Sequence, residues 1–251
     1  MKKILLAVFL LNALNNSAQT KTAALIGLSS SKTTVSYIGK KPVVENYDGR
    51  CLADLSKSYN DSLGFNSLKF KIDSVLTLMG FRLLPDDSVL KTENYREISK
   101  KISGPMRFAD KPSLAILASG FGYTERSGFG SLAYLKEYFQ MNPKPDIVID
   151  AMIDFNVNVA TDPKTQKDKV NVVCTLYFKS FTENNKKPFK FRVNYTHPHN
   201  IAVKAAQNCW GFEIIEDISQ YKKEALKEAL KLIDEDLKKE IEDVNKFYSG
   251  K

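Results

Sequence analysis

The longest regular pattern in the chain is a stretch of alternating apolar and polar residues between positions 146 and 159. Ile147 and every second residue after it are apolar, whereas most intervening positions, beginning with Asp146, are polar. Because side chains along a β-strand point alternately to its two faces, this period predicts a long strand with one buried and one more polar face. Residues 170–181 and 189–196 alternate in the same way and are joined by short polar loops. The sequence therefore predicts an antiparallel three-strand meander.

The end of the chain has a helical period instead. Between residues 217 and 248, apolar residues from Leu226 to Tyr248 recur at spacings of three and four. This spacing predicts a long C-terminal amphipathic helix. We expect its apolar stripe to dock on the sheet of the same domain; the alternative is a coiled coil with a partner helix.

The first half of the chain alternates short apolar segments with helical patterns. Strands are predicted at 23–28, 81–84 and 114–118, helices at 52–63, 68–79, 93–101 and 132–139, and a closing turn at 85–87. Strands and helices that alternate first, followed by consecutive strands, indicate an α/β fold of the α+β kind, in which helices pack on a mixed sheet. No repeat or linker divides the chain, so residues 19–251 are expected to form a single globular domain.

The first residues have the order of a secretory signal peptide. Met1-Lys2-Lys3 is cationic, residues 4–11 are apolar, and Ser17-Ala18-Gln19 supplies the small residues that a signal peptidase requires. The apolar run is far shorter than the ~20 residues that span a bilayer. We expect residues 1–18 to be removed and the mature chain, without a transmembrane segment, to be exported to the periplasm or outside a bacterial cell.

Charge and cysteine content refine this expectation. Lysine and arginine number 37 against 29 acidic residues, a formal net charge of +8, but the lysines are spread along the chain. A mildly basic surface is predicted, with no nucleic-acid partner. Three cysteines follow the signal, and an oxidising compartment permits one disulfide, for which Cys51 and Cys209 are favoured. The alternative is three buried free thiols; Cys174 lies in an apolar strand pattern and is expected in the core.

A glycine-rich segment between a predicted strand and a predicted helix is the candidate ligand or partner loop. Phosphate-binding loops occupy this position. The segment has neither the Gly-Lys-Ser/Thr end of a P-loop nor the glycine spacing of a dinucleotide fold, so no cofactor is expected. A surface loop that exposes its two aromatic residues, Tyr123 and Phe129, is favoured, and a ligand or partner role is the alternative. Its candidate binding residues are Gly120, Gly122, Tyr123, Arg126, Gly128 and Phe129.

Histidine and aspartate residues are further candidates for a metal or catalytic site. His197 and His199 face the same side of an extended chain and could share a metal ion, but no third ligand is marked, so an exposed strand end without metal is predicted. Asp150 and Asp154 stand ~13 Å apart along a strand, too far for a glycosidase pair. We expect these two carboxylates to lie on a solvated sheet face, and no catalytic residue is assigned.

The order of elements between residues 23 and 195 resembles the α/β domain of bacterial envelope proteins related to the curli-secretion channel protein and the TolB amino-terminal domain. The likeness consists of the strand Ala23–Leu28, the helix that ends at Gly80-Phe81 before an acidic turn, and Pro145–Asp150 leading into the meander. It implies an envelope-associated, non-enzymatic domain that acts by assembly or protein contact. The lipoprotein cysteine of lipid-anchored members is missing, and no functional residue is carried over.

These observations predict an exported bacterial envelope protein of the non-enzymatic binding or assembly type. Its partner would be an envelope protein or a second copy of the chain. The alternative is a secreted small-ligand-binding protein or hydrolase with its site near residues 120–130.

Overall fold

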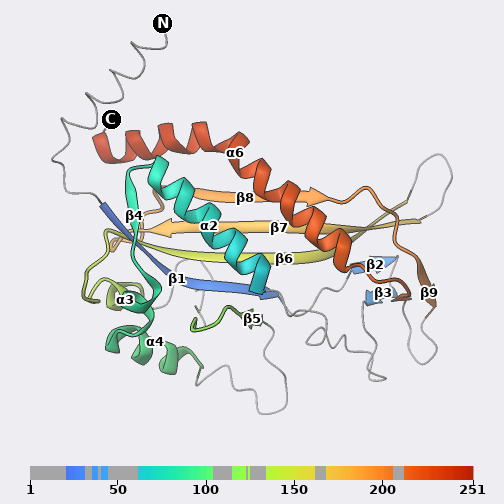
Figure 1. Cartoon of the computed structure of the whole chain (residues 1–251), viewed down its shortest axis with the longest axis horizontal. Helices are drawn as coiled ribbons and strands as arrows, with labels where there is room; N and C mark the ends of the chain where they lie inside the picture. Colours follow the sequence, from blue (N-terminus) through green and yellow to red (C-terminus); the bar gives the residue numbers. More distant parts are fainter. Residues whose placement is uncertain are drawn as a thin grey trace, which may run out of the picture.

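A computed structural model describes residues 21–31, 36–38, 41–44, 62–103, 115–122, 124, 134–161, 168–205 and 212–250. Its larger sheet is mixed and has the strand order β4-β1-β6-β7-β8 (Figure 1). The neighbours β4, β1 and β6 run parallel, and β6, β7 and β8 run antiparallel. The predicted fold class is therefore confirmed. The strands on this path are β1 (Lys21–Ser31), β4 (Phe81–Leu83), β6 (Ile147–Thr161), β7 (Asp168–Phe181) and β8 (Lys190–Thr196), and a sixth strand, β5 (Ala115–Leu117), also pairs with β1.

The predicted meander is the longest-paired part of this sheet. β6 and β7 are paired from Val148 opposite Phe181 to Thr161 opposite Asp168. β8 then pairs with β7 from Lys179 opposite Lys190 onward. The period of two in the sequence located all three strands because most described residues on one face of each strand are buried.

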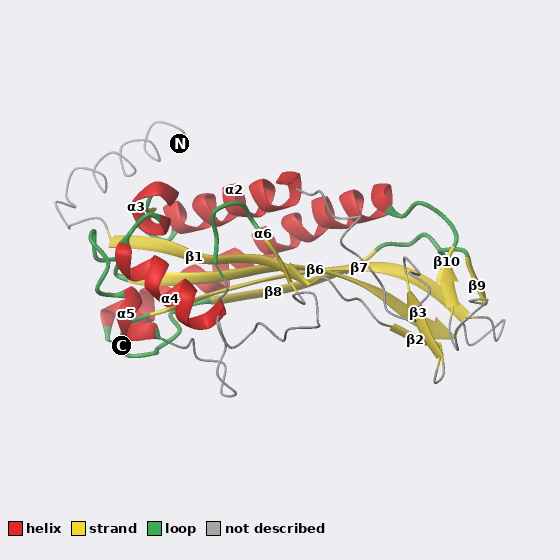
Figure 2. Cartoon of the chain, turned by 90° about the horizontal axis from the view of Figure 1, so that it is seen from below, coloured by secondary structure: helices red, strands yellow, loops and turns green. Residues whose placement is uncertain are grey.

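Two long helices cover one face of the sheet (Figures 1 and 2). They are α2 (Ser62–Leu78) and α6 (Ser219–Ser249). Ala229 and Ile233 of α6 are buried in the same core cluster as Cys174 of β7, which confirms that the C-terminal helix docks on the chain's own sheet. Cys174 is a fully buried free thiol, as expected, and burial raises its pKa.

Three shorter helices cover part of the opposite face. They are α3 (Asp86–Leu90), α4 (Glu93–Ser103) and α5 (Leu135–Tyr138). Their side chains form a second core with Ala24 and Ile26 of β1 and with Phe181 of β7. The sequence suggested only a turn at 85–87; a helix begins there because Pro85 precedes it and Asp86 and Asp87 favour the positive end of its dipole.

The second core corrects the prediction for Asp150. This residue was expected on a solvated face, yet it is 0% exposed, and its cross-strand neighbour Lys179 is only 4% exposed. Both lie on the sheet face of Val148 and Phe181, which belong to the second core. Asp154, four residues farther along the same strand, is half-buried. A strand pattern shows which residues share a face, but not how far helices extend over that face.

A smaller sheet lies at one end of the larger sheet, and α4 and α5 lie at the opposite end (Figure 2). Its strand order is β2-β3-β10-β9. The strands are β2 (Ser36–Ile38), β3 (Lys41–Val44), β9 (Val203–Ala205) and β10 (Phe212–Ile214). With three or four residues each, they are too short to show a period of two, and the sequence did not predict them. The signal peptide and most of the helix predicted at 52–63 lie outside the described residues.

Candidate functional site

One edge of β1 is shared by two short strands that leave a gap between them. β4 pairs with Lys21–Ala23, and β5 (Ala115–Leu117) pairs with Ser29–Ser31. The opposite edge of β1 pairs with β6. Residues 24–28 of β1, here called the edge gap, thus have no strand partner on this side in the described part of the chain.

A tyrosine from α4 fills the edge gap. The Tyr95 hydroxyl donates a hydrogen bond to the Ile26 carbonyl at 2.9 Å and accepts one from the Gly122 amide at 2.8 Å. On either side of it, the Leu84 amide bonds to the Ala23 carbonyl at 2.8 Å, and the Ala118 amide bonds to the Leu28 carbonyl at 3.0 Å. Burial raises the pKa of Tyr95 to about 12, so its hydroxyl keeps its proton at neutral pH.

A second polar contact holds the same segment on the sheet. The pairing of β1 with β6 shifts register between Leu25 and Gly27. At this bulge, Thr124 Oγ1 donates to Asp150 Oδ1 at 2.8 Å. A Cβ on Gly27 would lie 2.4 Å from that carboxylate oxygen, so a glycine is required there. The chain beyond β5 is therefore fixed to the sheet through Ala118, Gly122 and Thr124.

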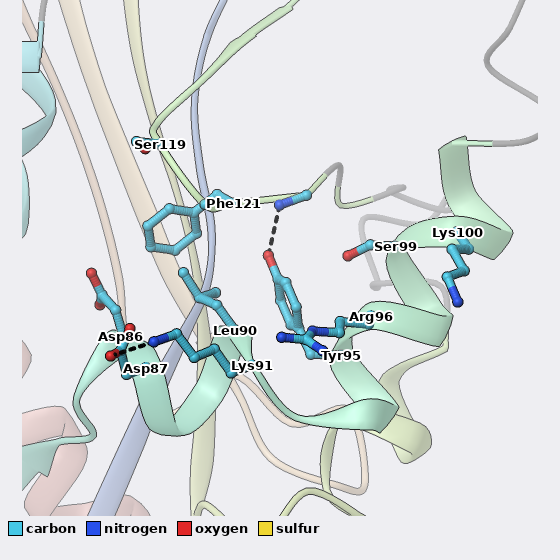
Figure 3. A pocket seen from close by; sticks show the side chains of 12 residues that line it. Asp86, Asp87, Leu90, Lys91, Tyr95, Arg96, Ser99, Lys100, Ser119 and Phe121 are labelled. Carbon is cyan, nitrogen blue, oxygen red and sulfur yellow. Dashed lines mark hydrogen bonds and ion pairs between the residues drawn. The ribbon is translucent and has the colours of Figure 1, made fainter.

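A groove of about 710 Å³ opens over the edge gap, between α3, α4 and the chain after β5 (Figure 3). We call it the edge groove. Leu90, Tyr95 and Phe121 supply its apolar and aromatic surface, and charged residues, serines and glycines line the rest. Its lining residues are Asp86, Asp87, Leu90, Lys91, Tyr95, Arg96, Ser99, Lys100, Ser119, Gly120, Phe121 and Gly122.

Most of the charges around the edge groove are paired. Lys91 contacts Asp87 at 2.7 Å, and Asp86 is held at 2.5 Å by Lys69, which lies outside the groove. Lys100 contacts Glu97 at 2.7 Å. Arg96 is exposed and forms no ion pair with another described residue. The guanidinium of Arg96 is thus the cation most available to an incoming group.

The structure places two of the six predicted loop residues in this groove. Gly120 has a φ of +85°, a conformation that glycine adopts readily, and Gly122 packs so closely on α4 that a Cβ would lie 2.3 Å from Ser99 Oγ. The other predicted residues, Tyr123, Arg126, Gly128 and Phe129, lie outside the described residues, as do Cys51 and Cys209.

Sequence reasoning did not single out Tyr95 and Arg96. Tyr95 lies on the buried stripe of α4 with Ile98 and Ile102, which by itself indicates only a core position. No spacing in the sequence reveals that the Tyr95 hydroxyl donates a hydrogen bond to Ile26, which lies 69 residues earlier in the chain. The one local hint was the glycine-rich segment, because close backbone packing requires residues without a Cβ.

The two histidines were expected at an exposed strand end, and the structure corrects this for His197. His197 is buried, and its Nε2 lies 2.9 Å from Glu224 of α6. His199 pairs with Glu216 at 3.2 Å and stacks on the Tyr221 ring, 4.1 Å between centroids. The rings share Tyr221 but contact different carboxylates. Within the described ranges, no three His, Cys, Asp or Glu residues are grouped to hold a metal ion.

Comparisons with known proteins assign no family. No family model matches the sequence, and no curated protein matches it closely enough to count as a relative. A solved structure described as a homolog of a neuraminyllactose-binding hemagglutinin from Helicobacter pylori matches 93% of this chain and 91% of that one, with 11% identity and a TM-score of 0.36. A similarity of this size assigns neither a family nor a ligand. In the described part of the chain, no helix has the length and apolar character needed to cross a membrane.

Proposed function

We propose that this protein is a non-enzymatic binding protein of the bacterial envelope and that the edge groove is its binding site. The observation that carries the proposal is the gap in the β1 edge, which is bridged by the Tyr95 hydroxyl instead of by a strand. The bridge leaves an open groove of about 710 Å³, within the range of small-molecule sites.

The position of the groove in the fold supports this assignment. The helix that follows β1 in the chain is α2, and it covers one face of the larger sheet. The helices α3 and α4 follow β4 and cover the opposite face. In open α/β sheets, ligands bind in crevices outside the carboxyl ends of strands. Asp86 and Asp87 line the groove directly after the carboxyl end of β4, beside the middle of β1.

The Tyr95 hydroxyl at the floor of the groove connects β1 to the chain after β5. The Tyr95 hydroxyl already donates one hydrogen bond and accepts another, and its raised pKa disfavours ionisation. A hydroxyl held in this way rigidifies the site, and a rigid site loses less conformational entropy when a ligand binds. The similarity in element order to envelope domains that act through contact is consistent with this role.

Export belongs to the same proposal. The cationic start, the apolar run at 4–11 and the small residues at 17–18 support secretion with cleavage after Ala18. The amino-terminal sequence of protein recovered from the periplasm or medium should begin at Gln19. Full-length chain confined to the cytoplasm would contradict export while leaving the binding proposal intact.

Native mass spectrometry of protein purified from the producing cells tests the binding proposal. Ser119 is exposed and lines the groove, so Ser119→Trp fills the groove with little effect on the core. Ser249→Trp, at the exposed end of α6, is the matched control. We expect a ligand or partner to be retained by the wild type and by the control and lost from Ser119→Trp. Equal retention by all three proteins would place the binding elsewhere. Chemical turnover of the retained molecule would favour the hydrolase alternative.

A further inference from the structure

We propose that the edge groove selects an anionic small molecule, whose carboxylate or phosphate is held by the guanidinium of Arg96. The apolar part of this ligand would lie against Leu90 and Phe121, which line the same groove. The inference rests on the proposed function and adds the chemical class of the ligand.

The distribution of charge favours an anion. Lys91, Arg96 and Lys100 line the groove together with two acids, Asp86 and Asp87. Asp86 pairs with Lys69 of α2, which does not line the groove. Asp86 therefore neutralises none of the three lining cations. Asp87 is neutralised by Lys91. The remaining lining cations are Arg96 and Lys100, and only Lys100 has a carboxylate neighbour among the described residues.

The lysine pairs at the rim are weak enough to rearrange. The side chains of Lys91 and Asp87 are 63% and 78% exposed, and those of Lys100 and Glu97 are 73% and 51% exposed. Exposed pairs of this kind contribute little free energy, because water screens the charges and two long side chains lose freedom. Either ammonium group can therefore turn toward a bound anion. Asp86, which is less exposed, stays with its lysine.

The wall of the groove formed by α4 carries Arg96. Ser99 lies one helical turn after Arg96 on α4, and both residues line the groove (Figure 3). Ser99 Oγ is buried against Tyr95, so this hydroxyl is not exposed to a ligand in the groove. Arginine presents a planar fork of donors that matches carboxylate and phosphate oxygens in pairs. The guanidinium of Arg96 can thus hold two oxygens of the same anion.

Calorimetric titration of the full mature chain with three small aromatic probes tests the inference. Phenyl phosphate and benzoate carry the two possible anionic groups, and benzylamine carries a positive charge on a ring of similar size. The variants are Arg96→Gln, which removes the charge from the groove, and Arg192→Gln, which removes one exposed charge from β8. We expect at least one anionic probe to bind the wild type more tightly than benzylamine. Arg96→Gln should weaken this binding about tenfold or more, and Arg192→Gln should not change it.

The outcomes separate this inference from the proposal on which it rests. Binding of phenyl phosphate alone would identify a phosphate ligand, and binding of benzoate alone a carboxylate ligand. Equal affinities for wild type and Arg96→Gln, preference for benzylamine, or no binding of either anion would overturn the inference. If that happens while Ser119→Trp still abolishes retention of the cellular ligand, the groove remains the binding site and only the charge of the ligand is wrong.

Discussion

Tyr95 on α4 donates a hydrogen bond to the main-chain carbonyl of Ile26 in β1, at 2.9 Å, where a neighbouring strand would otherwise bond. The same hydroxyl accepts the Gly122 amide. One side chain therefore satisfies the interrupted sheet edge and positions the wall of the edge groove. Stability and the shape of the groove depend on the same atom, so both can be tested through Tyr95.

Tyr95→Phe should destabilise the fold by about 1–3 kcal/mol, because a buried carbonyl and an amide each lose a partner. Denaturant unfolding would measure the change. Tyr134→Phe is the control, since Tyr134 is exposed and no hydrogen bond of its hydroxyl is seen within the described residues. Its effect should stay below about 0.5 kcal/mol. Equal effects of the two substitutions would show that the Tyr95 bridge contributes nothing to stability.

Gly27→Ala should be destabilising because its new Cβ would meet the Asp150 carboxylate and Thr124. Accommodating the methyl group requires the Thr124–Asp150 hydrogen bond to break or shift. Thr124→Ala removes that bond beforehand. In a double-mutant cycle, the two losses should therefore be less than additive, with a coupling of about 0.5 kcal/mol or more. Strict additivity would mean that Gly27 does not act on this contact.

Glu216→Gln should make the protein's stability less dependent on acid pH. The Ala202 amide and then His199 hold the pKa of Glu216 below its usual value. A carboxylate whose folded-state pKa is lowered stabilises the fold above its unfolded pKa and loses this contribution as pH falls through the folded value. The wild-type Tm should thus decline below about pH 4.5, and more steeply than that of the variant. Glu235→Gln, an exposed change on α6, should retain the wild-type slope.

Ile233→Ala should cost about 2–5 kcal/mol, because Ile233 is fully buried where α6 packs on the sheet. Leu78→Ala is a suitable control, since this aliphatic residue at the end of α2 is 62% exposed. It should change the free energy of unfolding by less than about 0.5 kcal/mol. A small effect at Ile233 would contradict docking of α6 on its own sheet and favour a partner helix.

A local sequence pattern predicts a helix or strand only when its buried face repeats over a long stretch of the chain. The meander and α6 were predicted because their buried faces repeat every two or three to four residues over long stretches. The strands β2, β3, β9 and β10 are too short for such a period. Burial of Asp150 was missed because it depends on helices that reach this face from elsewhere in the chain.

The candidate site was only partly predictable for a similar reason. Gly120 and Gly122 could be singled out because they lie in a glycine-rich segment between a predicted strand and a predicted helix, where phosphate-binding loops occur. The partners of that segment, Tyr95 and Ile26, lie far from it in sequence, and no motif connects them. Both contacts result from two short strands sharing one edge of β1, which is a property of the whole topology.

Binding in the edge groove can be tested without a known ligand. Isotope-labelled protein would be titrated with a library of small aromatic fragments balanced in charge, and amide chemical shifts would locate the binders. Fragments prefer concave, partly apolar sites. The largest shifts should fall on residues 119–122 and along α4, and Ser119→Trp should remove them. Shifts concentrated instead at the smaller depression lined by Asn66, Phe70 and Leu83, and unchanged in that variant, would contradict binding in the edge groove.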